Sequence, residues 1–113
     1  MRLNTVREYN WPMAANSPPV GQIRKAITGK NIITFTYANL LRTCEPHVYG
    51  MANGRQQILC WQLSGESQRG GIPEWRRFDL GDIRNFKITN KNFPGARPVP
   101  YPHSKWDRVI LSV

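Results

Sequence analysis

The chain has 113 residues, 40% of them hydrophobic, and carries a formal net charge of +9. This length suits one domain and is too short for two, and no stretch is apolar and long enough to span a membrane. Two cysteines are too few for the disulfide framework of a small secreted protein, and no apolar run of a secretory signal follows the N-terminal arginines. We therefore expect one basic, cytoplasmic domain.

The positive charge is rich in arginine and spread along the chain. Residues 1–68 contain seven Lys or Arg against three acids, and residues 69–113 contain nine against four. The planar guanidinium fork suits phosphate better than the lysine ammonium does, so the charge favours a nucleic-acid partner. A soluble basic surface without a ligand explains the same charge equally well.

The first part of the chain predicts an arm and a helix. Residues 1–16 are polar and without period, which indicates an N-terminal arm with Trp11 as its one anchor, so the domain proper spans residues 17–113. Ser17-Pro18-Pro19 is typical of a helix start, and the apolar spacing behind it predicts a short helix near residues 18–28. Gly29 would end this helix.

The remainder is predicted to be β. Apolar alternation and turn signals predict strands over residues 31–37, 42–51, 55–63, 74–80 and 84–89. Asn53-Gly54 is a strong two-residue hairpin signal, and residues 64–73 are a loop rich in Gly and Ser. Five or six short strands after one helix predict a small barrel.

The last part of the chain predicts an arm and a final strand. Prolines recur at positions 94, 98, 100 and 102, which predicts an extended, Pro-rich C-terminal arm outside the sheet core. Val109, Leu111 and Val113 alternate, so the chain is expected to end on a strand.

The Asn53-Gly54 turn would sort the hairpin residues by face, since a two-residue turn pairs Ala52 with Arg55 and sets the register beyond. Counting outward, one face receives Glu45, His47, Tyr49, Ile58, Cys60 and Gln62. The other receives Cys44, Pro46, Val48, Leu59, Trp61 and Leu63, which are apolar and expected to form the core. The first face is then either a binding surface or an ordinary solvated sheet face.

Catalytic and metal chemistry have weaker support in the sequence. Glu45 and His47 share a face at i, i+2 and would serve as base and acid of a small basic nuclease, which is kept as a lesser alternative. His47, Cys60 and Cys44 do not complete a zinc ligand set, and the chain contains no Walker-type phosphate loop. We expect no enzyme activity, metal or cofactor.

Several segments together resemble a WYL domain. The runs that resemble its opening are Ile23-Arg-Lys-Ala-Ile27, Ile33-Thr-Phe-Thr-Tyr37 and Arg42-Thr-Cys-Glu-Pro-His-Val-Tyr49. Trp61-Gln62-Leu63 stands where the family has Trp-Tyr-Leu, with Gln62 in place of the tyrosine, and Arg76-Arg-Phe-Asp-Leu80 is similar to its later Arg-x-Phe segment. The resemblance covers residues 20–113 and is closest to the compact, free-standing members.

The resemblance implies an SH3-like (Sm-like) small β-barrel of five to six strands behind an N-terminal helix. It also implies a non-catalytic, ligand-sensing or regulatory role of the kind found in bacterial and phage regulators and defence systems. The ligand would be single-stranded nucleic acid or an anionic nucleotide-like molecule.

The same resemblance places a ligand site around Arg42, His47, Tyr49, Arg76 and Arg77. The hairpin count and the neighbouring aromatic side chain add Glu45, Gln62 and Trp75 to this site. In it the aromatic rings would stack on bases and the arginines would meet phosphates, although Trp75 would serve equally well as simple packing.

A second interpretation is a protein-interaction subunit that forms a homo-oligomer or joins a larger complex. The Pro-rich arm and Trp11 favour it. Ligand, partner protein, oligomeric state and pathway stay open at this point.

Overall fold

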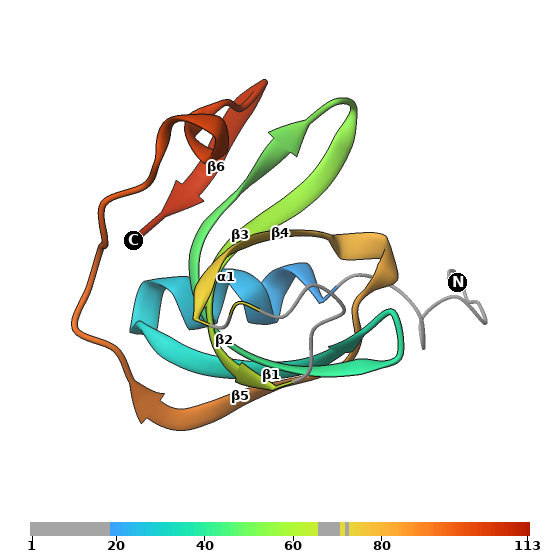
Figure 1. The fold of residues 1–113 in the computed structure, drawn as a ribbon, viewed down its shortest axis with the longest axis vertical. Coiled ribbons are helices and arrows are strands. Elements are labelled where there is room, and N and C mark those ends of the chain that lie inside the picture. Colours follow the sequence, from blue (N-terminus) through green and yellow to red (C-terminus); the bar gives the residue numbers. More distant parts are fainter. Residues whose placement is uncertain (1–18, 66–70, 72) are drawn as a thin grey trace, which may run out of the picture.

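The computed structural model describes residues 19–65, 71 and 73–113, and this part forms one helix and six strands (Figure 1). The elements are α1 (Val20–Gly29), β1 (Asn31–Tyr37), β2 (Leu40–Ala52), β3 (Arg55–Gly65), β4 (Glu74–Asp79), η2 (Leu80–Asp82), β5 (Arg84–Asn92), η3 (Tyr101–Ser104) and β6 (Arg108–Ser112). The prediction of a mainly β domain behind one helix is confirmed. The predicted N-terminal arm, the Ser17 cap and most of the loop over residues 64–73 lie outside the described residues.

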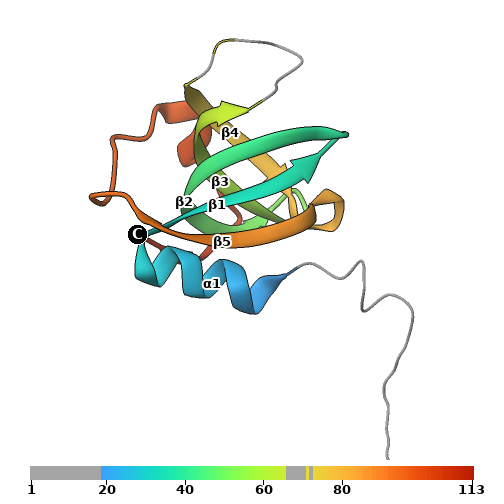
Figure 2. The ribbon, with the colours of Figure 1, turned by 90° about the horizontal axis from the view of Figure 1, so that it is seen from below.

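All strand pairs are antiparallel, in the order β4-β3-β2-β1-β5, and β6 pairs with the second half of β2. The outer strands β4 and β5 do not pair with each other in the described part of the chain, so the sheet is open where a closed barrel was expected. Figure 2 shows the strands curling around a common interior, with α1 lying beside β1 and β5. In the described residues, no helix has both the length and the hydropathy to cross a bilayer.

Helix α1 docks through a narrow apolar stripe. Ile23, Ala26 and Ile27 are buried at helical spacing, while Arg24 and Lys25 point outward and are exposed. The helix runs one residue past the predicted stop, because Lys30 and not Gly29 takes the left-handed conformation (φ 54°) and its N–H reaches the Ala26 and Ile27 carbonyls.

The core lies on the concave face of the sheet. Phe35 of β1 packs edge-on against Phe78 of β4, with ring centroids 4.9 Å apart, and Ile33 and Ile58 are fully buried beside them. Each such buried side chain contributes about 1.5–3 kcal/mol through the removal of apolar surface from water. The side chains of β2, β3 and β4 that point toward this interior are therefore on the concave face of the sheet.

The Asn53-Gly54 turn forms as predicted. Both turn residues have positive φ (54° and 74°), and Ala52 pairs with Arg55. This geometry suits the right-handed twist of the flanking strands, and asparagine and glycine tolerate it best. The predicted pairing of Tyr49 with Ile58 is also confirmed.

The register changes beyond Tyr49, and the predicted sorting by face is wrong there. Val48 pairs with Leu59 but Pro46 pairs with Cys60, so His47 is an extra residue that faces no single partner. Pro46 has no N–H for the ladder, and a β-bulge is where a strand accommodates a proline.

The bulge places Glu45 opposite Trp61 and Gln62 opposite Cys44. The register counted outward from the turn without a bulge had paired Glu45 with Gln62 and His47 with Cys60. A further correction concerns the face expected to be polar and accessible. Its members are buried, and three of them belong to the hydrophobic core, namely Tyr49, Ile58 and Cys60.

The Pro-rich segment joins β5 to η3 without regular structure over residues 93–100, and it packs back onto the sheet through the buried Phe93. The final strand predicted from alternation is β6, which pairs with residues 48–51 of β2. Gly50 permits this pairing, because a Cβ atom there would collide with the Arg108 carbonyl oxygen and the Trp106 ring.

Candidate functional site

The structure divides the predicted site residues among separate places. The inner group, at one end of the core, is Arg42, Gln62 and Arg76; the outer group is Glu45, His47 and Trp75; Tyr49 and Arg77 lie apart from both. The inner group shares the concave face with core residues of its own strands, since each member lies two residues from Cys44, Cys60 or Phe78. Its side chains form the polar end of the apolar interior.

Arg42 is the most unusual member of the inner group. Its residue is only 6% exposed, its Nη2 donates to the Tyr37 carbonyl oxygen at 3.1 Å, and its Nε is buried with no hydrogen-bond partner in the described residues. The guanidinium carbon lies 5.8 Å from the Tyr37 ring centroid and 5.6 Å from that of Phe78. No carboxylate pairs with Arg42 in this part of the chain.

Burial of the Arg42 charge has an energetic cost. A buried cation is costly unless an anion or several hydrogen bonds compensate it, and the two aromatic faces supply only part of that compensation. The charge of Arg42 is therefore only partly compensated within the described residues.

Arg76 and Gln62, the other two members of the inner group, have different contacts. Arg76 is 5% exposed, and its Nη2 lies 3.2 Å from Glu74 Oε2, so a carboxylate offsets its charge. Gln62 is fully buried and donates from Nε2 to the Ser64 carbonyl oxygen at 3.3 Å. These contacts make Arg42, rather than Arg76, the principal candidate for contact with an anion.

The outer group centres on the buried carboxylate of Glu45. His47 Nε2 lies 3.0 Å from Oε1, and Arg97 donates from Nε to Oε1 at 2.7 Å and from Nη2 to Oε2 at 2.9 Å. Burial acts to raise the pKa of Glu45, but the hydrogen bonds from Arg97 and His47 outweigh it and hold this pKa below its usual value. Burial also lowers the pKa of His47, against the opposing effect of Glu45.

Aromatic rings enclose this ion pair. The His47 ring lies 5.0 Å from the rings of both Trp75 and Phe93, and the Arg97 guanidinium lies 5.1 Å from the Trp61 ring. Both Glu45 oxygens accept hydrogen bonds from Arg97, and His47 is only 3% exposed. The acid and base of the nuclease alternative would need to reach a substrate, whereas this Glu45–His47 pair is buried. This cluster fastens the Pro-rich segment to β2.

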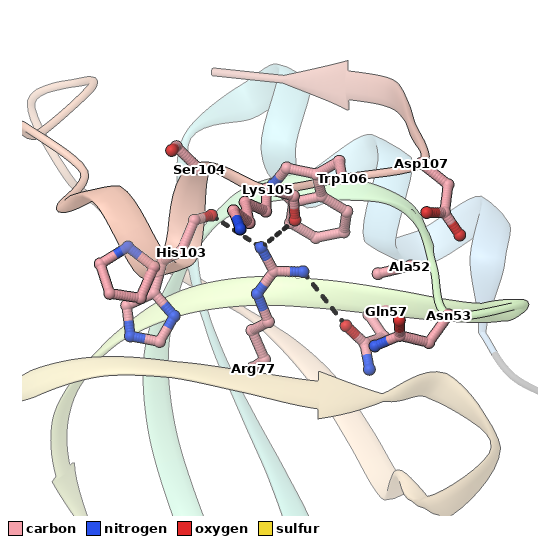
Figure 3. A pocket seen from close by; sticks show the side chains of 10 residues that line it. Ala52, Asn53, Gln57, Arg77, His103, Ser104, Lys105, Trp106 and Asp107 are labelled. Carbon is pink, nitrogen blue, oxygen red and sulfur yellow. Dashed lines mark hydrogen bonds between the residues drawn. The ribbon is translucent and has the colours of Figure 1, made fainter.

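Arg77 is engaged by the chain itself (Figure 3). Its Nη2 donates to the carbonyl oxygens of His103 at 2.8 Å and Lys105 at 2.5 Å, and its Nη1 donates to Gln57 Oε1 at 3.3 Å. The guanidinium also stacks over the Trp106 ring at 4.0 Å. It thus spans a cavity of about 750 Å³ between β4 and the segment that leads into β6, and burial lowers its pKa.

The Tyr49 side chain is also held by contacts within the fold. Its hydroxyl donates to Gln56 Oε1 at 2.6 Å and its ring is part of the hydrophobic core. Stacking of this ring on a nucleobase would require the core to open.

The cysteines show no catalytic or metal-binding arrangement. Cys44 and Cys60 are buried, and burial, with a smaller contribution from the hydrogen bond to Cys44, raises the pKa of Cys60 well above its usual value. Within the described ranges, no three His, Cys, Asp or Glu side chains are close enough to hold a metal ion.

Sequence reasoning missed Arg97 and Trp106, which make the two most extensive cation contacts of the C-terminal segment. Arg97 is 52 residues from Glu45 and Trp106 is 29 from Arg77, so no local spacing connects either pair. Comparison of the chain with protein-family models, with curated proteins and with solved structures finds no match.

Proposed function

We propose that this protein binds single-stranded nucleic acid or an anionic nucleotide-like ligand without catalysing a reaction, and that Arg42 makes the central contact with a phosphate. The observation that carries the proposal is the burial of the Arg42 guanidinium without a carboxylate partner in the described residues. Transfer of an ion from water into a protein interior costs several kcal/mol in real proteins. A phosphate oxygen at the guanidinium would offset that cost through a charge-assisted hydrogen bond.

The neighbouring side chains suit such a ligand. The half-buried Tyr37 ring would supply a flat surface at the same end of the core. The high net charge of +9 would raise the local concentration of any anionic ligand before it docks.

The fold assignment forms a second part of the proposal. The helix followed by five consecutive antiparallel strands in a curled sheet is compatible with an SH3-like (Sm-like) barrel of the WYL kind. The WYL resemblance in turn supports a regulatory or ligand-sensing role, as an accessory of a bacterial or phage regulatory or defence system.

A dinucleotide with a 5′-phosphate tests the proposed site directly. We would measure its affinity by calorimetry for the wild type, Arg42→Met and the exposed control Arg108→Met. The Arg42 variant should bind about tenfold or more weakly, because a hydrogen bond to a charged group contributes about 1.5–3 kcal/mol. The control should change the affinity by less than about twofold. Equal binding by wild type and Arg42→Met would reject the proposal.

Salt separates this proposal from the interaction-subunit interpretation. Phosphate binding weakens steeply as salt rises, because binding releases counterions from the nucleic acid, whereas an apolar protein interface is much less sensitive. Titrations at several salt concentrations therefore distinguish the two.

A further inference from the structure

One side of the molecule carries cations and no acids. Helix α1 and strands β1 and β5, with Lys30 between the first two, contain no Asp or Glu. The acids of the described residues all lie on other elements: Glu45, Glu74, Asp79, Asp82 and Asp107. We define the basic strip as five of the six exposed cations of this acid-free side: Arg24, Lys25, Lys30, Lys87 and Lys91. The sixth, Arg84, donates to the Gly81 and Ile83 carbonyl oxygens.

The helix part and the strand part of the strip meet at one end. The Asn92 side-chain amide donates to the carbonyl oxygens of Gly29 at 3.0 Å and Lys30 at 3.2 Å, and the Phe93 N–H donates to the same Lys30 oxygen at 3.0 Å. These bonds place the end of β5 against the end of α1, so Lys91 and Lys30 are neighbours. In Figure 1, β1 lies between α1 and β5.

The charges of the strip are not neutralised within the described part of the chain, where none of its members forms an ion pair. Several other arginines have partners within the fold. Arg55 pairs with Asp79 at 2.9 Å, Arg97 pairs with Glu45, and Arg77 donates to backbone carbonyls. The strip therefore concentrates the accessible positive charge.

We infer that the basic strip holds the phosphodiester backbone of a single nucleic-acid strand. This inference rests on the proposed function and extends it from a small anion to a polymer. Lys87 and Lys91 lie on β5, about 13 Å apart at 3.3 Å per residue.

The chemistry of the strip favours a nucleic-acid backbone over other anionic partners. A helix that lies on a lipid surface inserts an apolar face, but Ile23, Ala26 and Ile27 of α1 are buried in this protein's own core. A protein interface has an apolar centre, whereas the exposed large hydrophobic residues of the described part, Leu41, Tyr101 and Val109, all lie outside α1, β1 and β5.

The test compares two ligands and two matched pairs of substitutions. The ligands are a dinucleotide, too short to span the strip, and a twelve-residue oligothymidylate. Lys87→Gln/Lys91→Gln removes two strip cations, and Lys105→Gln/Arg108→Gln removes two exposed cations near the other end of the chain. Affinity would be measured by fluorescence anisotropy across a series of salt concentrations, and folding by thermal unfolding.

The strip pair should bind the dodecamer roughly tenfold more weakly at low salt, and its salt slope should fall by about 1.4, since each lost single-strand phosphate contact is worth about 0.7. Dinucleotide binding by this variant, and dodecamer binding by the control pair, should stay within about twofold of the wild type. An equal loss in the control pair would overturn the inference in favour of diffuse surface charge.

Other outcomes separate the two proposals. If the dinucleotide binds in an Arg42-dependent way but the dodecamer binds no more tightly, the strip inference fails and the proposed function stands. If the strip lysines matter for the dodecamer while Arg42→Met does not, the strip stands and the Arg42 site fails. Anionic phosphatidylserine vesicles form a third arm, and lysine-dependent binding to them without dodecamer binding would overturn the nucleic-acid partner.

Discussion

Arg97 and Glu45 form a two-point ion pair across 52 residues of sequence, with Nε–Oε1 and Nη2–Oε2 distances of 2.7 and 2.9 Å. The Glu45 side chain is 4% exposed and that of Arg97 is 40% exposed, so the pair sits at the boundary between the interior and solvent. It joins the Pro-rich segment to the centre of β2. The segment expected to extend as an arm therefore has a defined attachment point.

Removal of the arginine should weaken the fold. Arg97→Ala leaves the Glu45 carboxylate buried with only His47 beside it, so we expect unfolding to need about 1–3 kcal/mol less free energy; solvent at Arg97 keeps this below the cost for a fully buried pair. Urea unfolding measures the change, with Arg108→Ala as the control. If both variants unfold at the wild-type urea concentration, the ion pair does not hold the segment in place.

The same cluster predicts a loss of stability in acid. The pKa of His47 in the folded protein lies below its usual 6.5, so the unfolded chain takes up the proton first and stability falls as pH drops below about 6.5. The folded pKa of Glu45 lies below 4.5, so its contribution is present above that pH and is lost as pH falls through the folded value.

Urea midpoints at pH 7.5, 5.5 and 4 follow both steps. In His47→Gln the decline between pH 7.5 and 5.5 should be smaller than in the wild type, because the glutamine does not titrate. An unchanged decline in this variant would mean that His47 is not the group responsible.

Local signals predicted the fold better than long-range ones. The Asn53-Gly54 turn was predictable because its two positive φ angles are a property of those two residues. The His47 bulge was not, because a two-against-one pairing depends on how Pro46 meets the opposite strand. Tyr49 and Ile58 keep the predicted pairing and still lie in the core, so the pattern of one hairpin did not show which of its faces the rest of the sheet would cover.

The candidate site shows the same limit. The resembling motif predicts Arg42 as a site residue, but its lack of a carboxylate partner among the described residues is a property of strands that meet only in the folded chain. Arg77 is predicted with it, and the carbonyls that occupy its guanidinium come from a segment more than 25 residues later in the chain.

Arg77 should contribute to stability rather than to ligand binding. Arg77→Lys removes the fork that bridges the His103 and Lys105 carbonyls and the stacking on Trp106, and lysine cannot reproduce either contact. We expect faster amide hydrogen exchange in β6 and a loss of about 1–2 kcal/mol of stability. Dinucleotide affinity should be unchanged, and a tenfold loss of affinity with normal exchange in β6 would place Arg77 in the ligand site instead.

Arg42 should show the opposite behaviour, with binding and stability moving apart. A buried cation without a counter-ion lowers the stability of the unliganded protein, and replacement of buried ionic groups by apolar ones of similar volume is often neutral or stabilising by about 1–4 kcal/mol. Arg42→Met should therefore unfold at the same urea concentration as the wild type or a higher one, although it loses the bond to the Tyr37 carbonyl. The same variant should bind the dinucleotide poorly.

The ligand provides the matching measurement. A saturating dinucleotide should raise the unfolding temperature of the wild type, because it binds only the folded state, and the same concentration should raise that of Arg42→Met by less. Arg76→Met serves as the comparison, because it leaves Glu74 beside an uncharged side chain and should destabilise the protein. If Arg42→Met destabilises the unliganded protein as much as Arg76→Met does, then Arg42 is a structural residue and its buried charge is already compensated within the fold.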